Sequence, residues 1–364
     1  MLSKLTNITR KIPIPVLIIL IMVVAFVLRE YNADHINNDI KDLYGRQTIM
    51  AVDSMRGNFH FPNGPWLFEY DEAGFAWLLI PWIAVFGHQW IMFRTLTAII
   101  TSIVPGLLAL FSIRLWNRRT GIAVAVLFMT LPPQMVWDRN LIMACLALTT
   151  MIWFYSIYRL SKIPWESTLR FLKVGLILGV SCYVVHYNSM ILAPLVLIIA
   201  QRAFREKHSV LSTAGRIVMV VGGWFVVNIP NMIHKYRHPE YVDWRKRHFM
   251  EFNGDLVEYA GNYLSNLKTQ FGELFLGGGK YLFLHDDLAL FSPVFSILIL
   301  LGLIYLIRKD PWKIVIVFSM PVVLFVLSAT TKPEDWRGVF NFHYVPFLTI
   351  SAGLGLRQTG QWLS

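Results

Sequence analysis

The chain is poor in charged residues and in cysteine. Only 15% of its 364 residues are Asp, Glu, Lys or Arg, whereas 55% are hydrophobic. Soluble domains are about one quarter charged, so this composition excludes a single large soluble core and is typical of a membrane protein. The two cysteines, Cys145 and Cys182, each lie within an apolar run, which argues against a disulfide framework and gives no support to a redox role.

Acidic residues are scarce as well. The chain has 22 Asp and Glu against 33 Lys and Arg, which gives a formal net charge of +11. Nucleic-acid-binding proteins can have such a balance, but their basic residues form one continuous face. Here the basic residues lie in short clusters between apolar runs, so we exclude that class. Internal repeats and low-complexity tracts are also lacking, and we expect no soluble terminal domain.

Long apolar stretches are what the chain does contain. Runs of about 20 residues, enough to cross ~30 Å of hydrocarbon as a helix, recur along the whole sequence. No small-residue cleavage signal follows the first run, so we expect a retained span and not a removed signal peptide. The predicted fold class is an all-α polytopic membrane protein, with residues 1–364 as one transmembrane domain. The ten predicted spans are 12–29, 89–115, 121–137, 140–158, 173–187, 189–202, 216–233, 288–307, 312–330 and 339–356.

The order of the charges predicts the topology. Clusters of Lys and Arg alternate with the spans so that all of them fall on one face of the membrane, which the positive-inside rule makes cytoplasmic. Both termini are then cytoplasmic, in a plasma or inner membrane. Of the 22 carboxylates, only Glu166, Glu206 and Asp310 fall on this side, and the other 19 fall on the opposite side. A wrong number of spans would mix the two sets, so we expect an even number of crossings.

Two predicted extracytoplasmic segments, 30–75 and 231–287, are too long to be turns. They contain aromatic-rich amphipathic pieces, such as 75–86, that suit helices lying in the membrane interface. Long loops in a compact protein usually have a function, so the candidate site is expected at this surface. The first segment is rich in acids, which form either a solvated collar or a working site. These acids are Asp34, Asp39, Asp42, Asp53, Glu69, Asp71 and Glu72.

Arginines accompany these acids in the predicted topology. Arg94 lies inside the second span, where a buried guanidinium needs a partner. We expect Arg94 either to face protein or an anionic ligand, or to extend to the outer interface. Arg139 lies between the third and fourth spans, and Arg245 and Arg247 lie in the second long segment.

The order of these features resembles the GT-C glycosyltransferases over nearly the whole transmembrane region. The most similar branch contains the protein mannosyltransferases that use dolichyl- or polyprenyl-phosphate-mannose, and the aminoarabinose transferases. Their acidic motif after the first span corresponds to Asn38-Asp39 or to Asp42-Leu43, and neither place has the family's adjacent Asp-Glu pair. Spacing to Gly57 favours Asp42, whereas distance from the first helix favours Asp39.

Further motifs resemble the same family. The segment from Asp71-Glu72 through Phe86-Gly87 to Arg94 is similar to the family's Phe-Gly followed by an arginine. The turn at 137–140, which contains Arg139, looks like the short motif that opens the fourth span. The remaining two motifs are Pro239 with Arg245 in the large loop, and 342–346, where His343 stands in place of the family's arginine.

The resemblance implies an inverting glycosyltransferase that moves a sugar from a polyprenyl-phosphate donor to a protein, lipid or glycan acceptor outside the cytoplasm. Such a reaction needs a base for the acceptor proton, a role expected for Asp42 or Asp39. The phosphate leaving group needs positive charge more than a proton. For that role we assign Arg94, Arg139, Arg245 and Arg247, and for acceptor or sugar binding Asp71, Glu72, His343 and Tyr344. The acids could also hold a divalent ion, but no compact ligand spacing favours a metal.

Two other classes of membrane protein are alternatives. An O-antigen polymerase or ligase also acts on lipid-linked sugars, but its large arginine-bearing loop comes late in the chain and its first loop is not acidic. A lipid-linked sugar transporter or flippase predicts paired repeats, broken helices and charges inside spans. Here the charges gather at the ends of the spans, so glycosyl transfer is the favoured hypothesis.

Overall fold

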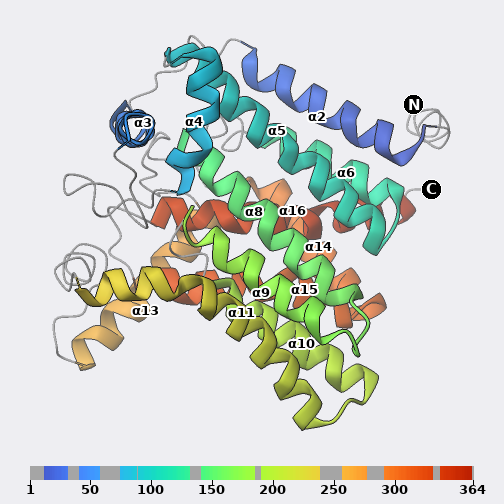
Figure 1. The fold of residues 1–364 in the computed structure, drawn as a ribbon. Coiled ribbons are helices and arrows are strands. Elements are labelled where there is room, and N and C mark those ends of the chain that lie inside the picture. The colour runs from blue at the N-terminus through green and yellow to red at the C-terminus, as the bar shows by residue number, and fades with distance from the viewer. Residues whose placement is uncertain are drawn as a thin grey trace.

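The computed structural model describes residues 12–31, 41–57, 74–87, 89–131, 141–184, 190–237, 256–276, 291–330 and 337–362. Thirteen α-helices lie within these ranges (Figure 1). They are α2 (Ile14–Glu30), α3 (Lys41–Met55), α4 (Gly74–Phe86), α5 (Trp90–Leu115), α6 (Arg118–Thr130), α8 (Leu141–Lys162), α9 (Thr168–Ser181), α10 (Leu192–Glu206), α11 (Val210–Arg237), α13 (Leu256–Phe275), α14 (Pro293–Lys309), α15 (Trp312–Ser328) and α16 (Arg337–Trp362).

Two of these helices are long and apolar enough to cross a membrane. They are α5, over Ile91–Leu115, and α11, and they differ in burial: 67% of the most apolar window of α5 is buried, but only 11% of that of α11. A core helix of a soluble protein would be mostly buried. The apolar exposed side of α11, with Phe225, Val226 and Ile229, therefore fits a lipid-facing helix of an all-helical membrane protein.

A described helix overlaps each of the ten predicted spans, although the bounds differ. Helix α9 begins at Thr168 and α11 at Val210, both before the predicted spans, because hydropathy marks the apolar stretch and the helix continues through its basic flank. Helix α6 ends at Thr130, whereas the predicted span continues to residue 137, beyond the described residues. How many of the helices cross a membrane stays a prediction.

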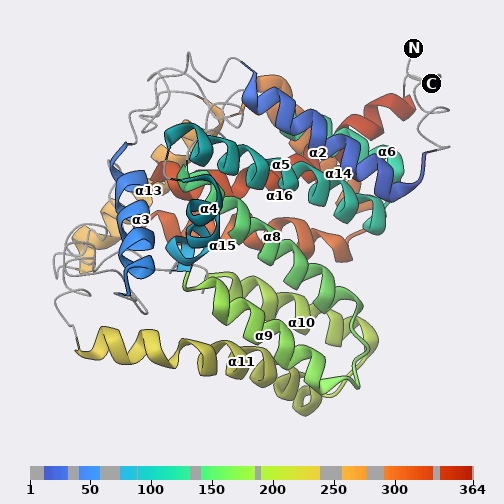
Figure 2. The ribbon, with the colours of Figure 1, turned by 45° about the horizontal axis from the view of Figure 1, so that its top comes forward.

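The bundle is arranged around α16. This helix packs against α14, α15 and α6, while α5 packs between α2, α6 and α8. Helices α9 and α11 run side by side at the edge of the bundle opposite α2 (Figures 1 and 2). Large aromatic side chains, among them Trp153, Phe154 and Phe347, fill the space where α8 and α16 meet, with the rings of Phe154 and Phe347 stacked at 4.7 Å.

Glycines allow two helix pairs to approach closely. Between α14 and α16, a Cβ added at Gly302 would overlap the carbonyl oxygen of Ser351, and one at Gly355 would overlap that of Leu298. The hydroxyl of Ser351 donates to the carbonyl of Ile299 at 2.9 Å across the same contact. Small residues that bring helix backbones together are a common way for membrane helices to associate. Gly175 of α9 meets the carbonyl of Val220 on α11 in the same way.

Polar contacts join the loops at the end of the bundle where α2 begins and α16 ends (Figure 1). Arg118, after α5, donates to the backbone carbonyl of Ile12. Lys313, after α14, donates to the carbonyl of Leu115 at 2.8 Å and to Asp310 at 3.2 Å. These hydrogen bonds join segments that are far apart in the sequence.

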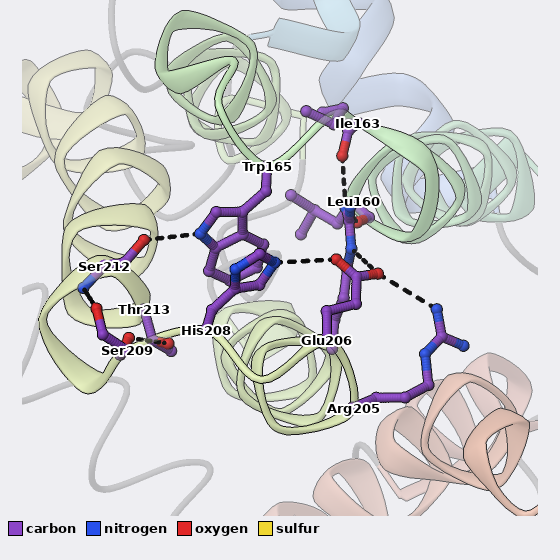
Figure 3. A network of polar contacts seen from close by, with 10 residues as sticks. Leu160, Ile163, Trp165, Arg205, Glu206, His208, Ser209, Ser212 and Thr213 are labelled. Carbon is purple, nitrogen blue, oxygen red and sulfur yellow. Dashed lines mark hydrogen bonds and ion pairs between the residues drawn. The ribbon is translucent and has the colours of Figure 1, made fainter.

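A second polar network at this end joins α8, α10 and α11 (Figure 3). Arg202 of α10 donates through one nitrogen to the carbonyls of Leu160, at 2.9 Å, and Ile163, at 2.6 Å. These carbonyls lie at the carboxyl end of α8, where the helix itself provides no donor. The same guanidinium donates to Glu206 at 2.9 Å.

The network continues through two rings. The indole of Trp165 stacks on the imidazole of His208 at 4.1 Å and donates to the hydroxyl of Ser212 at 2.7 Å (Figure 3). A nitrogen of His208 lies 3.1 Å from a carboxylate oxygen of Glu206. The turn between α10 and α11 is thus fixed against the loop between α8 and α9.

Candidate functional site

Helix α3 carries the candidate base at the end of the bundle opposite the start of α2 (Figures 1 and 2). Asp42 lies in its first turn, and Met50 and Ala51 are buried where α3 packs against α4. The helix stops before Gly57, whose φ of 97° lies in the left-handed region that glycine adopts readily. Asp42 therefore lies on a helix that packs against α4. Its side chain is outside the described part of the structure, and so is the whole of Asp39.

Arg94 forms an ion pair at the same end of the bundle. Its guanidinium lies 3.3 Å from the carboxylate of Glu30, and the two side chains are 9% and 24% exposed. Glu30 is the last residue of α2, and Arg94 lies in the second turn of α5. Because two charges in a poorly solvated place need each other, removing one of them is costly. Arg94 thus faces protein, as one of the two sequence-based alternatives expected.

His343 and Tyr344 form part of a buried polar group at the beginning of α16. The hydroxyl of Tyr344 lies 2.9 Å from that of Ser328 at the end of α15, and it accepts a hydrogen bond from Gln270 of α13 at 2.5 Å. Gln270 also donates to Ser328. His343 is 1% exposed, and its ring lies 4.7 Å from that of Trp153 on α8.

The described candidates therefore lie on several helices and form two groups, the Arg94–Glu30 pair and the group around Tyr344. The start of α5, which carries Arg94, the start of α16, which carries His343 and Tyr344, and helix α3 lie toward the end of the bundle opposite the start of α2 (Figure 1). The remaining candidates, Asp39, Asp71, Glu72, Arg139, Arg245 and Arg247, lie outside the described residues. The described groups are buried: Tyr344, Gln270 and His343 are at most 1% exposed, and Arg94 is 9% exposed.

Sequence reasoning did not identify Glu30, Gln270 or Ser328. The available signal for Gln270 is the helical spacing of Asn266, Gln270 and Glu273, which places three polar side chains on one side of α13. All three are less than 10% exposed. No comparable local signal exists for Glu30, because its partner Arg94 is 64 residues away in the sequence.

A metal site needs several His, Cys, Asp or Glu side chains close together. Within the described ranges, no group of three or more His, Cys, Asp or Glu side chains is placed to hold a metal ion. The acid-rich stretch 58–73 lies outside these ranges. Cys145 and Cys182 are not joined in a disulfide, and both are buried.

The chain matches no protein-family model, and no curated protein is significantly similar to it.

Proposed function

We propose that the chain is an inverting glycosyltransferase of the GT-C type. It would transfer a sugar from a polyprenyl-phosphate donor to a protein, lipid or glycan acceptor at the extracytoplasmic surface. The observation that supports this most directly is that α3, with Asp42 in its first turn, lies at the same end of the bundle as the Arg94–Glu30 pair and the Tyr344 group. A carboxylate, an arginine and polar side chains near one membrane surface are the groups that this transfer requires.

The chemical roles follow from charge. Asp42 or Asp39 takes the proton from the acceptor hydroxyl or amine as that atom bonds to the anomeric carbon. The bond from this carbon to the phosphate oxygen breaks, and its electron pair leaves with the polyprenyl phosphate. One displacement inverts the configuration, so no covalent intermediate with the enzyme is needed.

Arg94 would stabilise the leaving phosphate by charge-assisted hydrogen bonds. Glu30 compensates the charge of Arg94 at 3.3 Å, and a donor phosphate would take over part of that task. Arg139, Arg245 and Arg247 would add positive charge from neighbouring loops. His343 and Tyr344 would line the sugar or acceptor side, and Gln270 and Ser328 would hold Tyr344 in place.

The test is sugar transfer in nanodiscs that contain the purified chain, a synthetic polyprenyl-phosphate sugar and an acceptor. The variants are Asp39→Asn and Asp42→Asn, with Asp53→Asn as a matched control on the same helix α3. Loss of the base should lower the rate by a factor of roughly 10² to 10⁴. The control should keep the wild-type rate.

Full transfer by both candidate variants would refute the base assignment. A wild-type chain that carries the donor across the bilayer without transferring its sugar would indicate a transporter instead. A chelator added to the same assay tests for a divalent metal, because only a metal-dependent reaction would slow.

A further inference from the structure

Helix α13 buries three polar side chains beside the apolar Leu274, and several of its other apolar side chains are exposed. Its buried side contains Asn266, Gln270 and Glu273, which are 6%, 0% and 9% exposed. On the other side, Leu264 is 65% exposed and Phe271 is 52% exposed. A helix on the surface of a soluble protein has the opposite arrangement, with its apolar stripe facing the core.

The polar side chains are buried because this side of α13 packs against the carboxyl end of α15. The last carbonyls of a helix lack partners within that helix. Tyr263 donates to the carbonyl of Val326 at 3.1 Å, and Asn266 donates to that of Ala329 at 3.1 Å. Polar side chains of α13 thus satisfy backbone acceptors that would be costly to bury without a donor.

The exposed surface of α13 has two edges of different character. One edge is apolar and contains Val257, Leu264 and Phe271, which recur at intervals of seven residues, or nearly two helical turns. The other edge contains the exposed polar residues Ser265 and Thr269. An apolar and a polar edge side by side are what a helix presents when it lies along the boundary between hydrocarbon and water.

The apolar edge continues onto α15. Val322 and Val326 of this apolar helix are 56% and 44% exposed, and the Val326 carbonyl is the acceptor for Tyr263. The two helices therefore present adjoining apolar surfaces. Since α15 is one of the predicted spans, this continuity favours lipid as the occupant along both helices.

We propose that α13 lies in the membrane surface at the end of the bundle opposite the start of α2, with Val257, Leu264 and Phe271 in contact with the acyl chains of that leaflet. Its polar edge faces the headgroups and water, and its buried side is fastened to α15 and α16. Lys268, exposed one turn from Leu264, extends its ammonium group toward the lipid phosphates. This inference concerns membrane contact alone and holds whether or not the chain transfers sugars.

The test places an environment-sensitive fluorophore on single introduced cysteines in the full-length chain, reconstituted in phosphatidylcholine nanodiscs. The apolar edge is sampled by Leu264→Cys and Phe271→Cys, and the polar edge by Ser265→Cys and Thr269→Cys. Cys145 and Cys182 are buried, so the wild-type chain treated with the same label serves as the blank. Each sample is compared with phosphatidylcholine brominated on its acyl chains, and with iodide in the buffer.

Labels at positions 264 and 271 should emit at shorter wavelength and lose intensity with brominated acyl chains, while iodide has little effect. Labels at 265 and 269 should emit at longer wavelength and lose intensity with iodide, while brominated acyl chains have little effect. Quenching of the 264 and 271 labels by iodide alone would overturn the proposal, because this edge would then face water. Protection of these labels from both quenchers would overturn it as well, because protein would cover the edge. If a variant is not monodisperse in size-exclusion chromatography, Val257→Cys samples the same edge.

Discussion

At the scale of single residues, the charged groups differ in how far the sequence predicts their surroundings. The sequence predicts that Arg94 needs a partner, since it lies in an apolar stretch, but Glu30 is brought to it only by the packing of α2 on α5. Similarly, Tyr344 is singled out by the motif around His343, whereas Gln270 reaches it from a helix 74 residues earlier. Long-range hydrogen bonds depend on packing geometry, which short motifs do not encode.

Glu206 gives a prediction for the dependence of stability on pH. Burial alone raises the pKa of this carboxyl group, but hydrogen bonds from Arg202 and His208, the charge of Arg202 and a hydrogen bond from Arg205 outweigh it. The pKa in the folded protein is therefore below the ordinary value of 4.5. A lowered pKa stabilises the folded state at pH values above 4.5, and this stabilisation is lost as the pH falls through the folded-state value.

We expect Glu206→Gln to lower stability at neutral pH by about 1 kcal/mol or less, the range of partly exposed ion pairs. Thermal unfolding of the detergent-solubilised protein measures this effect, and the difference from wild type should shrink in acid. Glu166→Gln, at an exposed acid in the neighbouring loop, is the control and should have little effect at either pH. A deficit of equal size at neutral and acidic pH would contradict the charge-based explanation.

At the scale of helices, hydropathy predicts apolar elements better than polar ones. Each predicted span overlaps a described helix, although the bounds differ, and the expected piece at 75–86 is α4 (Gly74–Phe86). Helix α3 was not predicted, because its sequence is mixed in polarity and only Met50 and Ala51 among its described side chains are buried. The orientation of α13 was not predicted either, because the side of this helix that is buried is polar. That side is buried because its residues donate hydrogen bonds to carbonyl groups at the end of α15.

Gly302, in the contact between α14 and α16, and Gly222, on α11, should change the stability of the protein differently when each is replaced by alanine. Gly302→Ala should destabilise the protein by about 1–3 kcal/mol, the usual cost of overpacking, since the new methyl group would meet the rigid backbone of Ser351. Gly222→Ala on α11 is the matched control, because no atom lies within 4 Å of its Cβ position. There alanine should be neutral or stabilising by up to about 1 kcal/mol, as expected for helix propensity. Thermal unfolding of both variants in one detergent tests this, and equal destabilisation would refute the packing argument.

At the scale of the whole molecule, charge and structure can be compared at the two ends of the bundle. At the end where α2 begins, Arg118 joins the turn after α5 to the segment before α2, Lys313 joins the end of α5 to the start of α15, and Arg202 joins α10 to the end of α8. Helices α3 and α13, which belong to the two long predicted extracytoplasmic segments, lie at the other end (Figure 1). The sequence predicts this separation because each crossing of the membrane changes the side on which the next loop lies. The side of a loop therefore depends on the number and order of the spans before it, and small errors in the bounds of a span do not change that side. It does not predict which helices are neighbours, because packing depends on side-chain shape.

The positive-inside rule predicts the orientation of the bundle in the membrane, and this orientation can be measured directly. Lys309→Cys, at the end of α14, should be protected from a membrane-impermeant maleimide in intact cells and become labelled after permeabilisation. Arg56→Cys after α3 and Ser265→Cys on α13 are exposed positions at the opposite end, and they should be labelled in intact cells. Labelling of all three sites in intact cells, before permeabilisation, would contradict an even number of crossings with sorted loops. Labelling of Lys309→Cys alone in intact cells would instead invert the orientation and place the candidate site in the cytoplasm, where a sugar donor of the polyprenyl-phosphate class facing outward could not be used.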